Sequence, residues 1–219
     1  MSKKPRTLPA LERRYFSFEV RAEQDEQHGA IITGRPVVYS SVTDIAGLFA
    51  EVIEPGALDG ADLSDVRLLV NHNTNMIPLA RSRPNTDTST MRLTPDGEGL
   101  LMESGLDVEN NTDARALYSA VGRGDISGMS FMFSAAEEWW ENEDTDYPTR
   151  HITKFGAIVE VSAVTFPAYT DTDINARGGA LESARAALES ARRKAKRSNA
   201  PEGASAELAL AKAKALYIN

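Results

Sequence analysis

The decapeptide GDISGMSFMF, residues 124–133, is the stretch around which we expect the chain to fold. Glycines introduce it, and large apolar residues then alternate with small ones, which indicates a β-strand. Because successive side chains of a strand point to opposite faces, Ser130 falls on an open face with Gly128, whereas Ser127 falls on the apolar core face. A serine held on a rigid strand beside a glycine is a candidate nucleophile if a base and an acid reach it.

The composition is typical of a globular protein of one domain with appendages. The chain has 219 residues, 42% hydrophobic and 26% charged, and no apolar run long enough to cross a bilayer. Its basic start, residues 1–6, is not followed by an apolar stretch, so we expect no secretory signal. The chain has no cysteine, which excludes disulfides, thiolate nucleophiles and cysteine-based metal sites.

Charge is distributed unevenly along the chain. The net charge is −8, yet residues 1–14 and residues 178–219 are each basic, which leaves about −16 for the stretch between them. A nucleic-acid-binding domain needs a basic face, so we expect no nucleic-acid partner. The basic ends either are simply solvated or attach the protein electrostatically to an acidic partner.

The chain divides into three regions by composition. Residues 1–13 are expected to form a flexible basic leader and residues 14–177 a mainly β body with one clear helix at 110–121. The many short strands of the body, separated by turn signals, favour a barrel or a sandwich. Residues 178–219 are rich in alanine and basic residues and lack a strong apolar stripe, which predicts a separable helical tail. Its helices are expected at residues 180–197 and 205–217.

Histidine is the usual base partner of a serine nucleophile because its pKa lies near neutrality, and the chain has three. His28 lies in a polar turn and His151 at a strand start, where surface or packing roles are expected. His72 follows an apolar strand and stands between two asparagines. It is either the base or a hydrogen-bonded structural histidine. No second histidine or cysteine stands at metal-ligand spacing, so we expect no metal site.

The candidate acid is Glu160, in the apolar stretch AIVEVSAV at residues 157–164. A carboxylate inside such a strand is costly to bury unless it is paired or hydrogen-bonded. The alternative is a salt-bridged or outward-facing charge on an antiparallel sheet. Asp125 and Glu103, in turn and hairpin positions, are lesser candidates.

Several segments, in this order along the chain, resemble one known family. They are RYFSFEVR at 14–21, EVIEPGAL at 51–58, LLVNHN at 68–73, PLAR at 78–81, GDISGMSFMF at 124–133 and VEVSAVTFPAY at 159–169. Together they resemble the HK97-like prohead (capsid maturation) serine proteases of tailed bacteriophages. The likeness covers residues 14–177, and its specificity comes from the order of the motifs because each alone is modest.

The resemblance implies a serine endopeptidase with His72 as base, Ser130 as nucleophile and Glu160 as the acid. It implies an α+β, mainly β fold like that of herpesvirus assemblin, a closed β-barrel flanked by helices. The third triad member of assemblin is a histidine, and Glu160 would replace it here. Backbone N–H groups near Ser130 would bind the oxyanion, with Arg81 as a helper. No metal or cofactor is needed.

The resemblance also implies partners and a location. The substrates would be the scaffolding protein or the scaffold-like segment of the major capsid protein, and the protease itself, inside the procapsid assembling in the bacterial host cytoplasm. A homodimer is expected only by analogy with assemblin, and no membrane partner is expected. Residues 178–219 would be either an inert linker or a docking segment removed by self-cleavage.

Two other functions remain open. One is a non-catalytic head-assembly or scaffolding protein that keeps the protease fold. The other is an unrelated hydrolase of a small molecule, which would need a ligand pocket, although the sequence has no phosphate-binding loop and no nucleophile elbow.

Overall fold

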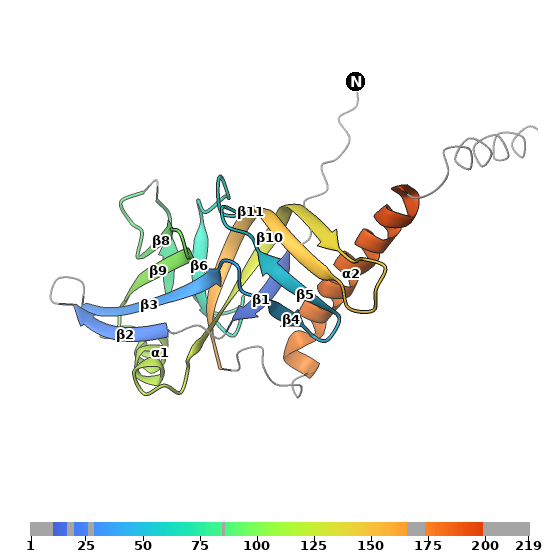
Figure 1. Ribbon diagram of the computed structural model, residues 1–219. Helices are drawn as coiled ribbons and strands as arrows, with labels where there is room; N and C mark the ends of the chain where they lie inside the picture. Colours follow the sequence, from blue (N-terminus) through green and yellow to red (C-terminus); the bar gives the residue numbers. More distant parts are fainter. Residues whose placement is uncertain (1–10, 17–19, 26–28, 85, 166–173, 199–219) are drawn as a thin grey trace, which may run out of the picture.

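The computed structural model describes residues 11–16, 20–25, 29–84, 86–165 and 174–198. These residues form two β-sheets and two helices, arranged with α1 beneath one end and α2 beside the other (Figure 1). The α+β, mainly β class expected from the sequence is confirmed. None of the described helices is both long and apolar enough to span a membrane.

The larger sheet carries the strand with the candidate nucleophile, which lies next to its edge strand. Its strands are β1 (Glu12–Phe16), β4 (Thr43–Ile45), β5 (Phe49–Ile53), β6 (Val66–Val70), β7 (Ala80–Ser82), β10 (Gly128–Glu141) and β11 (Thr149–Val164). They run in the order β1-β10-β11-β5-β4, with β6 pairing both β11 and β7. The long strand β11 pairs in parallel with β5 near its start and with β6 near its end. This branching places the end of β6 beside the end of β11.

The smaller sheet has the order β2-β3-β9-β8. Its strands are β2 (Val20–Asp25), β3 (Gly29–Val38), β8 (Met91–Pro95) and β9 (Gly99–Leu106). Helix α1 (Thr112–Gly122) packs against β2, and the Asn111 side chain caps its first turn by accepting from two backbone N–H groups. The helix buries Ala114, Leu117 and Val121, as its apolar spacing predicts.

The closed barrel implied by the family resemblance is wrong for the described strands. The larger sheet ends on β4, whose ladder is with β5, and on β1, whose ladder is with β10. Strand β3 of the smaller sheet packs on β10, but no ladder connects the two among the described residues. The two sheets instead share one apolar core that includes Phe131, Phe133 and Phe155. The fold is therefore two open sheets around a common core.

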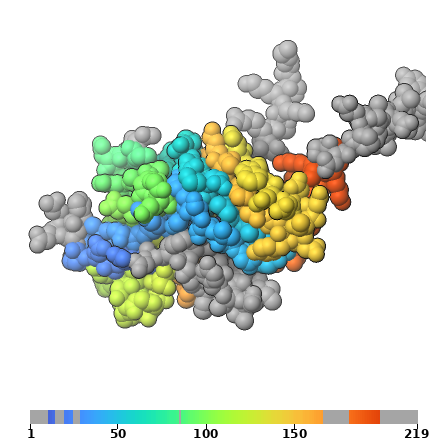
Figure 2. Space-filling model, in the orientation of Figure 1, coloured from blue at the N-terminus to red at the C-terminus, as the bar shows by residue number. Residues whose placement is uncertain are grey.

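Helix α2 (Ile174–Ser198) is packed against the body of the protein. Ala184 and Leu188 are buried against Phe49 of β5, and Arg192 donates to the backbone oxygens of Glu143 and Thr145 in the β10–β11 turn. The red helix and the yellow hairpin accordingly lie side by side in the space-filling view (Figure 2). The division into leader, body and tail stays a prediction, but its boundary after residue 177 falls within α2. The expected helix at 205–217 lies outside the described residues.

Candidate active site

Ser130 lies on β10 and has no exposed surface. Its face is therefore covered, not open as the sequence predicted. Ser127 precedes β10 and is exposed, so its expected place on the core face is wrong because the strand begins one residue later, at Gly128. Met129, Phe131 and Phe133 are fully buried in the core, as expected. In register, Ser130 faces Ser162 of β11.

His72 lies in the turn that follows β6, and this turn is fastened to β11. Asn71 and His72 both have positive φ angles, 50° and 55°, which is uncommon for residues other than glycine. The Asn71 side chain exchanges two hydrogen bonds of 3.0 Å with Thr165, just beyond β11. The Asn71 backbone N–H also donates to Ala163. The surrounding contacts therefore hold the imidazole in a backbone conformation that is otherwise unfavourable.

The three residues singled out in the sequence meet at one point. His72 Nε2 lies 2.5 Å from Ser130 Oγ, and His72 Nδ1 lies 2.6 Å from Glu160 Oε2. Glu160 sits on β11 beside Met132 of β10, and its carboxylate is buried. With Nδ1 protonated and donating to Glu160, Nε2 is left as an acceptor for the Ser130 hydroxyl. Such a chain of contacts can activate a hydroxyl for nucleophilic attack.

Strand β1 covers the serine. Ser130 Oγ lies 2.5 Å from the backbone oxygen of Arg14, to which it can donate. A hydroxyl has one proton, so the Arg14 oxygen and His72 Nε2 compete for it. Ser130, His72 and Glu160 are 0%, 6% and 3% exposed, which leaves no room for a substrate at the serine in this state.

A buried ion cluster holds β1 in place. Arg14 donates to Glu51 of β5 and to Glu12, with 2.7 Å between Arg14 Nη2 and each nearest carboxylate oxygen. Arg150 of β11 forms two hydrogen bonds with Glu12, of 2.6 and 2.7 Å, and donates also to Glu51 and Glu138. We call these five residues the buried ion cluster. It ties β1 to strands that follow it by up to 138 residues.

Electrostatics explain why these charges tolerate burial. Burial alone would raise the pKa of the Glu12 carboxyl, but the hydrogen bond from Arg150 and the charge of Arg14 lower that pKa below its ordinary value. Burial would likewise lower the pKa of Arg14, yet Glu51 and Glu12 raise it. Glu12 and Arg14 are thus each stabilised by a partner far away in the sequence, Arg150 and Glu51 respectively.

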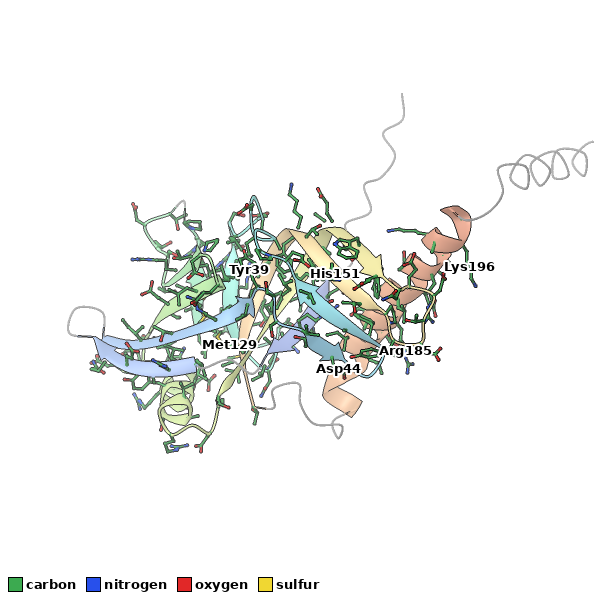
Figure 3. All side chains as sticks on the ribbon, viewed as in Figure 1. Tyr39, Asp44, Met129, His151, Arg185 and Lys196 are labelled. Carbon is green, nitrogen blue, oxygen red and sulfur yellow. The ribbon has the colours of Figure 1, made fainter. Side chains whose placement is uncertain are left out.

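The other residues considered in the sequence lie elsewhere. His151 stacks on Trp139 and contacts Glu54, near the opposite end of the β10–β11 ladder from Met129 (Figure 3). Arg81 forms a two-pronged ion pair with Asp65. Asp125 is paired with Arg123, Glu103 is paired weakly with Arg92, and His28 is outside the described residues.

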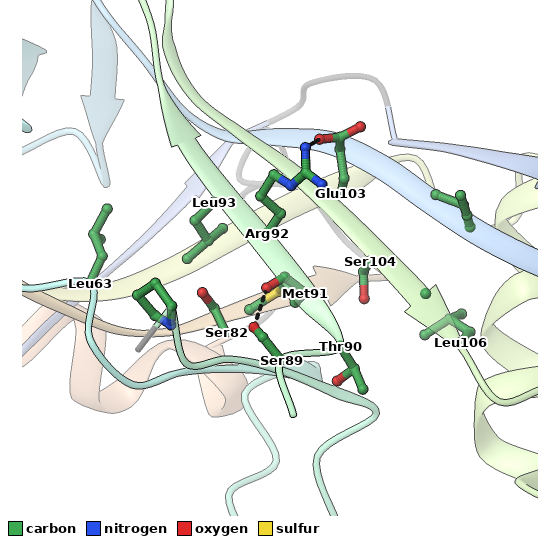
Figure 4. Close-up of a pocket in the computed structure, with 13 residues that line it drawn as sticks. Leu63, Ser82, Ser89, Thr90, Met91, Arg92, Leu93, Glu103, Ser104 and Leu106 are labelled. Atoms are coloured by element: carbon green, nitrogen blue, oxygen red, sulfur yellow. Dashed lines mark hydrogen bonds and ion pairs between the residues drawn. The ribbon is translucent and has the colours of Figure 1, made fainter. Parts of the chain in front are cut away.

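A cavity of about 740 Å³ opens over β7, β8 and β9 (Figure 4). Met91 and Leu93 supply apolar walls, and Ser82 and Ser104 supply polar ones. Ser130, His72 and Glu160 are all absent from its lining. This cavity is therefore separate from the candidate active site.

Sequence reasoning missed two features of the site. Ser162, two residues after Glu160 and on the same face of β11, contacts both Glu160 and His72. The alternation of β11 was the signal that could have found it. The cover by Arg14 depends on the pairing of β1 with β10, which no local pattern indicates.

Comparison with known protein families agrees with the geometry. The family model described as caudovirus prohead serine protease matches residues 16–186, which include all three residues that meet at Ser130. No curated protein and no solved structure showed significant similarity to the chain. The match covers well over half of the sequence, so the chain belongs to the caudovirus prohead serine protease family.

Proposed function

We propose that this chain is a serine endopeptidase in which Ser130 is the nucleophile, His72 the general base and Glu160 the acid that orients the base. The observation that carries the proposal is the continuous contact from Ser130 Oγ through the His72 imidazole to the Glu160 carboxylate. The family match supports the same chemistry independently. The non-catalytic alternative has no comparable use for three buried polar side chains in this order.

In the first half of the proposed reaction, Ser130 Oγ attacks the carbonyl carbon of the scissile bond while its proton passes to His72 Nε2. Glu160 holds Nδ1 protonated and stabilises the positive imidazolium. The tetrahedral intermediate then collapses: the C–N bond breaks, and the leaving amine takes the proton from Nε2. The product of this half is an acyl ester on Ser130.

In the second half, water attacks the ester and gives a proton to His72 Nε2. The second tetrahedral intermediate breaks its bond to Ser130 Oγ, which regains the proton, and the carboxylic acid product leaves. Backbone N–H groups near Ser130 would stabilise the negative oxygen in both halves. Arg81, the helper expected from the resemblance, is paired with Asp65 in this state.

Substrate entry requires β1 to move. Ser130 is fully buried, and its hydroxyl can donate a hydrogen bond to the Arg14 backbone oxygen. Displacement of β1 would expose the serine and leave His72 Nε2 as the acceptor for the Ser130 proton. The state described here is then a closed form of the enzyme, and catalysis proceeds from an open one.

The proposed substrates follow from the family. They are the scaffolding protein or the scaffold-like segment of the major capsid protein, and the protease itself, inside the procapsid in the bacterial cytoplasm. The basic residues 178–219 would either dock the protease on the scaffolding or capsid protein or serve only as a linker. Deletion of residues 199–219, beyond α2, followed by counting protease copies per procapsid, separates these two roles.

The test of the function is co-expression of the chain with the capsid and scaffolding proteins of its phage. Ser130→Ala should abolish processing of these proteins, as followed by gel electrophoresis and mass spectrometry. Ser134→Ala is the matched control, since Ser134 is a buried serine on the same strand. Processing that continues with Ser130→Ala would leave the head-assembly role as the better assignment.

A reversible disulfide tests the movement of β1. Arg13 and Met132 are cross-strand partners, at a spacing that a disulfide accommodates, and the chain has no other cysteine. In the double variant Arg13→Cys/Met132→Cys, oxidation should stop cleavage and reduction should restore it. The pair Arg92→Cys/Glu103→Cys on the smaller sheet is the control. Equal activity of the oxidised and reduced β1 variant would rule out the movement.

A further inference from the structure

We propose that Ser162 is a positioning residue that fixes the His72–Glu160 pair in its working geometry. The inference rests on the proposed function, because it assigns a fourth residue to the same site. Ser162 touches neither the scissile bond nor Ser130 Oγ in the reaction described above. It acts through the base and the acid.

Ser162 is placed between the two residues that it contacts. It lies on β11, opposite Ser130 of β10 and beside Leu69 of β6 in the parallel register. Its hydroxyl donates to Oε1 of Glu160, the carboxylate oxygen that His72 does not use. Its oxygen also accepts from the His72 backbone N–H at 3.0 Å. The single hydroxyl thus serves the side chain of the acid and the backbone of the base at once.

The hydrogen bonds have only one consistent direction. A backbone N–H can only donate, and an ionised carboxylate can only accept. Ser162 is fully buried, so water does not compete for its hydroxyl in the closed state. Its proton must therefore point to Glu160 and its lone pair to the His72 N–H. This fixed direction distinguishes Ser162 from a surface serine that rotates freely.

The first consequence concerns the Glu160 carboxylate. A carboxylate that hydrogen-bonds through one oxygen only can rotate about its last bond. With Oε1 held by Ser162, Oε2 is directed at His72 Nδ1. Because an ionised Oε2 at 2.6 Å from Nδ1 can only accept a hydrogen bond, it favours the tautomer with the proton on Nδ1 and the lone pair on Nε2. That tautomer is the one that accepts the Ser130 proton.

The second consequence concerns the backbone of the base. His72 has a φ of 55°, a conformation that costs free energy for a residue with a Cβ. Its buried N–H would be left without this acceptor if Ser162 lost its oxygen. Asn71 anchors the same turn to Thr165, but it does not replace that acceptor. Ser162 therefore aims the imidazole as well as the carboxylate.

The neighbouring positions on β6 and β10 offer the Glu160 carboxylate little other charge. On β6, Arg67 is the register partner of Glu160, but its guanidinium is paired with Asp65. On β10, the positions beside Glu160 and Ser162 are Met132 and Ser130. The ionised Glu160 carboxylate thus depends on His72 and on the Ser162 hydroxyl. Ser162→Ala would therefore remove one of the hydrogen bonds that hold this carboxylate in place.

The experiment compares Ser162→Ala with Ser162→Thr, which keeps a hydroxyl. The control is Ser104→Ala, since Ser104 is equally buried and its hydroxyl has no hydrogen-bond partner among the described residues. The substrate is a quenched fluorescent peptide that spans a processing site mapped with the wild-type enzyme. The readouts are kcat and KM, and circular dichroism checks folding. Ser162→Cys, close to serine in size and a weak donor, replaces the alanine variant if that variant does not fold.

We expect Ser162→Ala to lower kcat by about 10- to 100-fold, the range for a lost hydrogen bond to a charged group, with KM changed less than about twofold. Ser162→Thr should recover most of the activity, and Ser104→Ala should match the wild type. An unchanged kcat for Ser162→Ala, in an active enzyme, would overturn the inference.

A second readout is independent of catalysis. The proton shared by His72 Nδ1 and Glu160 should give a far-downfield proton NMR signal in the full chain. Ser162→Ala should shift or broaden that signal, and Ser104→Ala should leave it in place. If the wild type shows no Ser130-dependent cleavage, the proposed function fails, but this signal still decides the role of Ser162. A signal that is identical in Ser162→Ala would refute the positioning role.

Discussion

Arg150→Met is the substitution that most sharply tests how the fold closes over Ser130. Arg150 is the shared partner of Glu12, Glu51 and Glu138, and its side chain is fully enclosed. Methionine keeps much of the apolar stem but leaves Glu12 and Glu51 with the single guanidinium of Arg14, and it removes the Arg150 partner of Glu138. Removing one partner of a buried ion pair costs about 3–5 kcal/mol. We therefore expect the free energy of unfolding to fall by about that amount.

The assay is guanidinium chloride unfolding at pH 7, followed by the fluorescence of the chain's two tryptophans. Trp140 is a sensitive reporter because the Arg150 guanidinium lies 5.9 Å from its ring centre. The matched control is Arg35→Met, which removes a two-pronged pair with Asp96 that is only partly buried and should cost at most about 1 kcal/mol. Adding Glu12→Gln to Arg150→Met should recover part of the loss. A loss for Arg150→Met no larger than that for Arg35→Met would refute the reasoning.

Three further predictions address the site, the response to pH and helix α2. Glu160→Gln keeps the shape of the acid but not its charge, so kcat should fall by about 10²- to 10⁴-fold with little change in KM; a smaller loss would remove Glu160 from the triad. Burial raises the pKa of Glu12, but the hydrogen bond from Arg150 and the charges of Arg14 and Arg150 together bring that pKa to a net value below the ordinary one. The stability that Glu12 contributes is therefore full above its unfolded-state pKa and lost as the pH falls through the lower folded-state value, and Glu12→Gln should flatten that acid dependence in urea titrations between pH 7 and pH 3. Leu188→Ala uncovers Phe49 beneath α2 and should cost about 2 kcal/mol, with earlier proteolytic release of the helix, whereas unchanged proteolysis would mean that α2 is not held by this contact.

The residues of the candidate site were predictable because each has a modest local signal and the order of the motifs along the chain made the set specific. Ser130 stands in an alternating strand, His72 at the end of an apolar one, and Glu160 is a carboxylate with apolar neighbours. A polar side chain that is buried without a hydrogen-bond partner costs free energy, and the chain has only three histidines that could pair with the serine. Their roles stay a proposal, but the structure brings the three side chains within hydrogen-bonding distance.

The features that could not be predicted depend on contacts between distant segments. Glu12 lies in the stretch expected to be a mobile leader, yet it is buried against Arg150, 138 residues away. The pairing of β11 with both β5 and β6, and the register shifts between β10 and β11, are revealed by no composition pattern. Helix α2 has too weak an apolar stripe to indicate docking by itself, but Phe49 provides a matching surface. The barrel was inferred by analogy alone, and sheet pairing decided against it.

The most direct measurement of the central claim is to react the purified full chain with diisopropyl fluorophosphate and to locate the adduct by peptide mass spectrometry. The account predicts one adduct, on Ser130, formed at a rate that falls at least about 100-fold in His72→Ala. Ser134, a buried serine on the same strand, should stay unmodified. An enzyme that cleaves its substrates but carries the adduct on another serine, or labels Ser130 equally fast without His72, would contradict the assignment.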